Sequence, residues 1–262
     1  MSRMDERCYM DYKLLADTAL LAGELMLQSG AETYRVEETI TRILKTSGQA
    51  RTEAIAYATG IMMTLDGEDS GVISMVVRIG DRDTNLGQVS EVNNISRAYC
   101  DGKLSLEEAN RRLKAIRGVK RYPDWAVVLC AIVTSAGFTL LLGGGVYDCL
   151  FSAIYGVLQV VFMFMNRKIR INRFILNVIT AFFVAFMTEA LVILSKLPIN
   201  QELLIAGSIM PMLPGVALTN ALRDTLQGDY MSGTVRTIEA FMVAISIGIG
   251  IGAGLFAAAW IL

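Results

Sequence analysis

The chain has 262 residues, enough for one large domain or two smaller ones, and its formal net charge of −1 favours neither nucleic acid nor an acidic substrate as a partner. Histidine is absent, which excludes Ser-His-Asp catalysis and imidazole–metal sites, so we expect no metal. The four cysteines show no C-x-x-C pair and are interpreted as reduced thiols.

The charged residues are unevenly distributed along the chain. Of the 49 Asp, Glu, Lys and Arg residues (24 basic and 25 acidic), 36 precede Trp125. The remainder of the chain is dominated by apolar tracts. We therefore predict an α-helical integral membrane protein with two parts: a small cytoplasmic α+β domain over residues 1–124, and five transmembrane helices over residues 125–262.

The first part shows alternating helical and extended patterns. The predicted order is two helices, two strands and two helices. The helices are expected at residues 11–30, 31–48, 88–102 and 105–118, and the strands at residues 52–66 and 71–80, separated by the turn sequence "GEDSG".

Two S-x-x-E patterns predict capping boxes at helix starts, one formed by Ser29 and Glu32 and the other by Ser105 and Glu108. The acidic and basic residues that open the second helix are interpreted as an exposed face: Glu32, Arg35, Glu37 and Glu38. Neither G-x-x-x-x-G-K-[ST] nor G-x-G-x-x-G is present, so we expect no nucleotide cofactor.

Five apolar tracts follow, each close to the ~20 residues that cross a bilayer. They are Trp125–Leu142, Val146–Met165, Phe174–Leu194, Leu203–Leu222 and Ile238–Leu262. Lys and Arg concentrate before the first tract and between the second and third, which predicts a cytoplasmic N-terminus and an outside C-terminus. In the last tract, Gly248 with Gly252 and Gly250 with Gly254 have the spacing of a close helix-packing face, within this chain or against a partner.

Two prolines interrupt the fourth tract. Pro211 lies about eight residues, or ~12 Å of helix, from the predicted outer end, which places "PMLPG" near the bilayer centre. Pro211 and Pro214 each remove a backbone donor, and Gly215 lowers the cost of leaving the helix. A broken helix at this depth is typical of transporter substrate sites, although a simple proline kink is the alternative. Polar residues continue the pattern: Thr219, Asn220, Arg223 and Asp224.

Charged residues near this tract supply the remaining candidates. Glu189 lies inside the third tract, where a carboxylate is costly and often functional; it could pair with Lys196, accept a proton or bind a coupling ion. Asp229 is a second candidate proton carrier. Arg236 and Glu239 are candidates for a gating or ion-pair contact, and a solvated rim is the alternative for the charges near the cytoplasmic boundary.

Two motifs, "SGAETYRVEETI" and "PMLPGVALTNALRDTLQGDYMSGTVR", resemble the threonine/serine exporter family, as does the five-span layout behind a cytoplasmic domain. The resemblance covers essentially the whole chain. It implies export of small polar metabolites across the bacterial cytoplasmic membrane. Full-length members carry a second membrane module that this chain lacks. A small multi-span partner protein is therefore expected, with a homo-oligomer as the alternative.

The resulting hypothesis is a subunit of a secondary transporter rather than an enzyme, without a cofactor and with proton coupling as an option. The substrate is a threonine/serine-type amino acid or a dicarboxylate such as succinate. Backbone N–H groups near Gly215 and the Arg223 side chain would bind a carboxylate, Thr219 and Asn220 would bond polar groups, and Asp224 would meet an ammonium. The alternatives are a membrane-anchored hydrolase or sensor acting through the cytoplasmic domain, and a scaffold that stabilises its partner.

Overall fold

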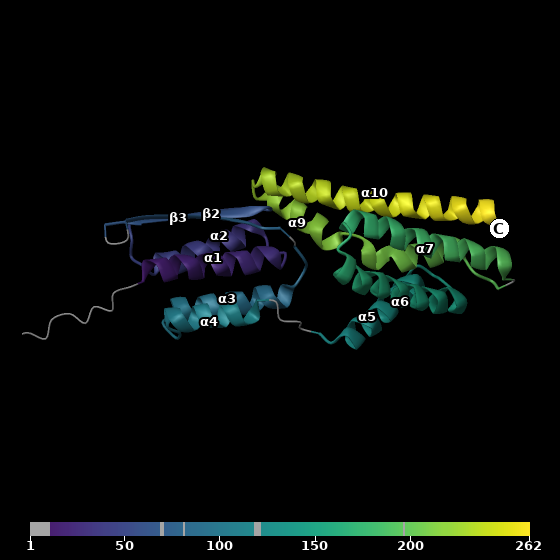
Figure 1. Cartoon of the computed structure of the whole chain (residues 1–262), viewed down its shortest axis with the longest axis horizontal. Coiled ribbons are helices and arrows are strands. Elements are labelled where there is room, and N and C mark those ends of the chain that lie inside the picture. The colour runs from purple at the N-terminus through teal and green to yellow at the C-terminus, as the bar shows by residue number, and fades with distance from the viewer. Residues whose placement is uncertain (1–10, 69–70, 81, 118–121, 196) are drawn as a thin grey trace, which may run out of the picture. The chain divides into compact units, whose positions relative to one another are not determined.

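The computed structural model describes the chain except for residues 1–10, 69–70, 81, 118–121 and 196. The chain folds as two compact units, each formed by two segments. The first unit contains Met1–Val119 and Val216–Thr237, and the second contains Lys120–Gly215 and Ile238–Leu262. The predicted combination of an α+β region with several apolar helices is confirmed (Figure 1).

Four helices and a sheet build the N-terminal part of the first unit. The helices are α1 (Tyr12–Gln28), α2 (Thr33–Lys45), α3 (Leu86–Cys100) and α4 (Leu106–Ile116). The sheet covers α1 and α2 on one side, and α3 and α4 pack on the other (Figure 1). Because α1 lies between these layers, its side chains are buried almost all round, including Leu15, Leu25 and Leu27.

The start of α2 differs from the predicted capping box. Gly30, at a φ of 80°, terminates α1, and α2 begins at Thr33 with Glu32 as an N-cap residue that makes no capping bond. The Ser29 hydroxyl instead donates to Gln88 Oε1 at 3.0 Å. The Ser29–Glu32 prediction was therefore wrong, whereas Ser105 does cap α4 by accepting a bond from the Glu108 N–H at 3.3 Å.

Three strands form the sheet, one more than predicted. They are β1 (Arg51–Tyr57), β2 (Gly60–Gly67) and β3 (Gly71–Arg78), antiparallel in the order β1-β2-β3. The first extended run folds back at Ala58 and Thr59, a two-residue turn without the Asn-Gly or Asp-Gly pair that signals a hairpin. The predicted turn between β2 and β3 includes residues 69–70, which lie outside the described residues.

The first unit is completed by a hairpin of two helices from the C-terminal half of the chain. Helix α9 (Gly215–Leu226) and the start of α10 (Tyr230–Ile261) meet at Gly228, whose φ is 90°. A Cβ atom at Gly233 would lie 3.0 Å from the Ala221 carbonyl oxygen, so glycine is what lets the two helices approach here.

The second unit contains the remaining apolar helices: α5 (Asp124–Leu141), α6 (Val146–Ile169), α7 (Arg173–Leu194), α8 (Gln201–Ile209), the 3₁₀ turn η1 (Met210–Met212) and the rest of α10. Among the described residues, four helices are long and apolar enough to cross a membrane, and the bent pair of α8–η1 with α9 raises the number to five. The chain is thus a multi-pass membrane protein.

The glycines of α10 form a packing face on one side only. Cβ atoms at Gly250 and Gly254 would lie 2.4 Å from the Val178 carbonyl oxygen and 2.5 Å from the Phe182 carbonyl oxygen of α7. At Gly248 and Gly252, a Cβ atom would meet nothing within 4 Å. The predicted packing face is therefore formed within this chain by the second pair, against α7.

This asymmetry predicts unequal effects of the same substitution. Gly254→Val should destabilise the protein by about 1–3 kcal/mol, because the new side chain overlaps α7 backbone. Gly252→Val carries the same helix-propensity cost without the overlap and is the matched control. Thermal unfolding of both variants in detergent measures the difference, and equal melting temperatures would contradict the α7–α10 packing.

Candidate functional site

The helix break lies where the prolines predicted it. Helix α8 ends at Ile209, η1 follows, and α9 begins at Gly215, with a bend of 57° between the two arms. Pro211 and Pro214 cannot donate to the carbonyls of Gly207 and Met210, four residues earlier. The Met210 carbonyl is satisfied instead by the Leu213 N–H at 3.2 Å, the tighter bond of the 3₁₀ turn.

Buried polar side chains surround α8 just before the break. The Ser208 hydroxyl lies 3.0 Å from Ser152 Oγ on α6, and the Thr139 hydroxyl of α5 donates to the same oxygen at 2.7 Å. Gln159 Nε2, also from α6, donates to the Ser208 carbonyl at 2.6 Å. All three hydroxyl residues are fully buried. In a bilayer such side chains satisfy one another and support backbone next to a disrupted turn.

Small residues allow this polar contact. A Cβ atom at Gly207 would lie 2.1 Å from Thr139 Oγ1, so α8 can approach α5 only with glycine there. Thr139, Ser152 and Ser208 were not predicted as a group. Their signal was weak, because isolated hydroxyl residues occur in many apolar helices, where they bond the carbonyl of the preceding turn.

Two carboxylates lie at the end of the second unit where α7 connects to α8. Asp148 is 2% exposed and accepts bonds from the N–H groups of Gly145 at 2.8 Å and Asn200 at 2.9 Å, so it ties two connections together. Glu189, the predicted coupling residue, accepts a hydrogen bond from Gln201 Nε2. The predicted alternative pairing with Lys196 lies outside the described residues.

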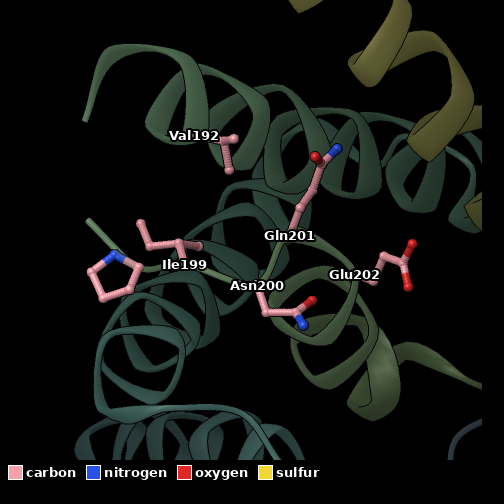
Figure 2. A pocket seen from close by; sticks show the side chains of 6 residues that line it. Val192, Ile199, Asn200, Gln201 and Glu202 are labelled. Carbon is pink, nitrogen blue, oxygen red and sulfur yellow. The ribbon is translucent and has the colours of Figure 1, made fainter. Parts of the chain in front are cut away.

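A shallow hollow opens beside this Glu189–Gln201 contact. Figure 2 shows Gln201 lining it, with Asn200 and Glu202 pointing in other directions. Its remaining lining residues are Val192, Pro198 and Ile199. Three apolar and three polar residues therefore line the hollow.

The second predicted motif, residues 211–236, places several of its polar side chains at the turn between α1 and α2. Asp224 is fully buried, its Oδ2 lies 3.1 Å from Arg236 Nε, and its Oδ1 accepts the Thr33 hydroxyl at 3.2 Å. Thr33 is the first residue of α2. A carboxylate of α9 thus lies at the positive end of the α2 dipole, which its own N-cap residue leaves unbonded.

Two further bonds reach carbonyl groups of the same turn. Asn220 Nδ2 donates to the Gly30 carbonyl at 2.9 Å, and Arg236 donates through a second nitrogen to the Ala31 carbonyl at 2.9 Å. We call this set the α2 clamp: Thr33 and the Gly30 and Ala31 carbonyls on one side, and Asn220, Asp224 and Arg236 on the other. It joins the motif "SGAETYRVEETI" to the motif "PMLPGVALTNALRDTLQGDYMSGTVR".

The acidic residues that open α2 are not one exposed face, as the sequence suggested. Glu32 is 7% exposed and forms ion pairs with Arg223 of α9 and with Arg35. Glu37 is half-buried and accepts the Ala56 N–H of β1 at 2.8 Å. Only Glu38, which pairs with Arg42, is well exposed. The prediction failed for Glu32 and Glu37 because their partners come from other elements.

The turn between α9 and α10 contacts the sheet. Asp229 accepts the Ser232 N–H at 3.1 Å, and the Ser232 hydroxyl accepts the Ala58 N–H at 3.1 Å. Burial raises the pKa of Glu37, and the negative charge of Asp229 adds to the rise, against the lowering effect of the Ala56 N–H bond.

Thr219 lies on α9 beside Asn220, and Glu239 lies on α10 three residues after Arg236. No group of three or more Cys, Asp or Glu in the described part of the chain is arranged to hold a metal.

Comparison with known proteins gives one family and several distant relatives. Residues 17–257 match the family described as "Putative threonine/serine exporter". The chain is 25% identical over 84% of its length to the "Probable succinate transporter subunit YjjP" of Klebsiella aerogenes, covering 85% of that protein, and 24% identical over 86% to the Escherichia coli protein of the same name, covering 87%. It is 22% identical over 88% of its length to the "Probable threonine/serine exporter" of Mycobacterium tuberculosis, of which it covers 44%. No solved structure gives a significant match.

The α2 clamp predicts a large difference between two arginines. Arg236→Met should lower the free energy of unfolding by about 3–5 kcal/mol, because it leaves the buried Asp224 carboxylate without its counter-ion. Arg223→Met removes an ion pair whose arginine is half-exposed and should cost about 0–1 kcal/mol. Thermal unfolding in detergent measures both. Adding Asp224→Leu to Arg236→Met should recover part of the loss, and a simple sum of the two effects would contradict the pairing.

The raised pKa of Glu37 predicts a pH dependence of stability. Folding favours the neutral carboxyl, so this contribution is fully present below the ordinary glutamate value of 4.5 and is lost as the pH rises through the raised value. Glu37→Gln keeps an acceptor for the Ala56 N–H without a titrating charge. The melting temperature of this variant should therefore gain on that of the wild type as the pH increases across this range. A constant difference between the two would be inconsistent with burial of the charge, and Glu38→Gln is the exposed control.

Proposed function

Because the chain belongs to the threonine/serine exporter family, we propose that it is a subunit of a secondary transporter that exports small polar metabolites across the bacterial cytoplasmic membrane. The observation that carries the proposal is the helix break between α8 and α9 within an apolar tract. Irregular backbone at membrane depth is tolerated where it lines a cavity or is covered by protein, and in transporters it marks the substrate site.

The beginning of α9 suits a carboxylate. The first N–H groups of a helix have no intrahelical acceptor and carry the positive end of its dipole. The Gly215 N–H bonds the Leu213 carbonyl at 2.9 Å, so a carboxylate would bond the N–H groups that follow it in the first turn. Pro214 precedes the helix, and a Cβ atom at Gly215 would meet nothing within 4 Å, so a ligand can approach the backbone closely. Pro211, Pro214, Gly215 and Thr219 are the residues we assign to this site.

The substrate class follows from the shared carboxylate. Threonine, serine and succinate all present one, and the names of the relatives include both kinds of substrate. For Asn220 and Asp224 to contact substrate as predicted, the α2 clamp must change. For Arg223, the ion pair with Glu32 must change. In this conformation, these side chains bond Gly30, Glu32 and Thr33 respectively. We therefore propose that they hold the start of α9 in position and reach the substrate only when the clamp opens.

A partner completes the transporter. Two relatives are named as subunits, and the chain spans less than half of the Mycobacterium tuberculosis relative. We propose a small multi-span membrane protein as the source of the second half, with the homo-oligomer as the alternative. The basic loops favour a cytoplasmic N-terminus and an outside C-terminus. Glu189 and Asp229 remain the candidates for proton coupling, and Arg236 and Glu239 those for gating.

Efflux measured in the native bacterium tests the proposal with any partner present. A deletion strain loaded with labelled threonine, serine or succinate should retain at least one of them, and the wild-type chain should restore its efflux. Gly215→Leu should reduce that efflux at least ~10-fold, because a side chain would cover the backbone groups that bind the carboxylate. Gly137→Leu on α5, where a Cβ atom also meets nothing within 4 Å, is the matched control.

Two results would contradict different parts of the proposal. If none of the three compounds is retained by the deletion strain, the substrate class is wrong. If Gly215→Leu reaches wild-type efflux at equal abundance in the membrane, the helix break is not the binding site. Proton coupling is tested in the same assay, since Glu189→Gln should remove the dependence of efflux on the pH gradient if Glu189 carries the proton.

A further inference from the structure

The two edges of the sheet in the first unit differ in whether other elements of the chain bond to them. Along β1, the Ala56 N–H points away from β2 and donates to Glu37 Oε1 at 2.8 Å, and just beyond the strand the Ala58 N–H donates to Ser232 Oγ at 3.1 Å. Side chains of α2 and α10 thereby cover the Ala56–Ala58 end of this edge. Strand β3 forms the other edge, and within the described residues it pairs only with β2.

The register identifies which groups of β3 are directed outward. Tyr57 and Gly60 flank the two-residue turn and form a hydrogen-bonded pair, and such pairs alternate along an antiparallel ladder. In β2, the residues that face β3 are therefore Ile61, Met63 and Leu65, opposite Val77, Met75 and Ile73. The backbone N–H and C=O groups of Val72, Ser74 and Val76 consequently point to the outer edge.

This edge lacks the usual protection against strand pairing. The one charged residue of β3 is Arg78, at its last position, and from Gly71 to Val77 the strand "GVISMVV" contains no charged residue and no proline. Natural edge strands normally carry a lysine, a proline, a bulge or a covering element, because an open edge is a template for another strand. An edge left open along a regular strand indicates a partner strand.

The open face of the sheet adds an apolar row that ends at this edge. Ile55, Met62 and Val76 lie opposite one another on the three strands and are 48%, 49% and 71% exposed. Val72, two positions along the same face from Ser74, is also 71% exposed. The row is thus most exposed at β3, where nothing in the described chain continues it.

We propose that β3 pairs antiparallel with β3 of a second copy of this chain, about a two-fold axis at Ser74. This register pairs Gly71–Val77 with the same residues of the partner and leaves the charged Arg78 at the end of β3 outside the pairing, since Gly71 then lies opposite the partner subunit's Val77. It places Val72 opposite the partner subunit's Val76, and the same contact recurs across the axis. The outward backbone groups become bonded, and the two apolar rows join into one.

A second copy fits this edge better than an unrelated strand. The paired residues Gly71–Val77 are uncharged and can lie against their own copy without bringing like charges together, and each exposed valine meets the other exposed valine rather than a polar group. The inference concerns the first unit alone. It neither requires nor excludes the proposed transport, and its test is independent of efflux.

Disulfide cross-linking of the full chain in native membranes tests the register. In a background with the four native cysteines replaced by alanine, Ser74→Cys should give a dimer under mild oxidation, because directly opposed residues have Cα atoms about 5.5 Å apart. Glu53→Cys, on the same face of β1 and well exposed, is the matched control and should give at least ~10-fold less dimer.

A mixed experiment distinguishes this register from a random encounter. Val72→Cys and Val76→Cys, co-expressed with different tags, should cross-link to each other. Either variant alone should not, because the two copies of one position would be separated by four residues, or about 14 Å of strand. Val76→Lys should abolish the Ser74→Cys dimer by introducing charge at the edge, whereas Val76→Thr should preserve it.

Each other outcome overturns the proposal. Equal dimer from Ser74→Cys and Glu53→Cys indicates contact without this pairing, and no dimer from any variant indicates a free edge. A cross-link from Ser74→Cys to a different protein assigns the edge to a hetero-partner. Protection of the Ser74→Cys thiol by lipid vesicles, without dimer, assigns the apolar row to the membrane surface.

Discussion

The buried ion pair between Asp224 and Arg236 is the interaction on which the first unit depends. Two opposite charges removed from water are tolerated only when each is paired and the remaining polar atoms are bonded. Here Thr33 bonds the carboxylate and the Ala31 carbonyl accepts from the guanidinium. The pair therefore fixes three elements at once: α9, α10 and the start of α2. Without it, the α9–α10 hairpin would lose its most specific contact with the N-terminal domain.

A second constraint acts at the helix break. Two prolines three residues apart remove two backbone donors from a tract that is otherwise apolar, and the bilayer offers no water to replace them. Three features compensate for the lost bonds. They are the bond of the 3₁₀ turn, the Gln159 amide that donates to the Ser208 carbonyl, and the hydroxyl groups of α5 and α6 beside α8. The α8 side of the break is thus supported by polar contacts. The beginning of α9 is the part of the break that we propose as the carboxylate site.

The features that sequence predicted well are local ones. Apolar tracts predict the transmembrane helices, Pro211 and Pro214 predict the break, and the glycine spacing of α10 predicts a packing face. Each of these features depends on residues close together in the chain. The hairpin at Ala58 was missed because its turn residues are atypical. The end of the first helix at Gly30 was predicted, but the Ser29–Glu32 capping box was not formed, because Ser29 bonds Gln88 of α3 instead. The α2 clamp was out of reach altogether, since Thr33 and Asp224 are 191 residues apart and neither pattern indicates the other.

The clamp also explains why two motifs far apart in the chain both contain several charged and polar residues. Each motif by itself has the pattern of a solvated helix end, and for that reason Glu32 and Glu37 were predicted to be exposed. Together they bury charges that neither could bury by itself. Helix α10 begins at Tyr230, carries the clamp residue Arg236 in its second turn, and continues without interruption to Ile261. Its apolar part packs on α7 through Gly250 and Gly254, so a single helix contains both the partner of the buried Asp224 and a glycine face of the apolar helices.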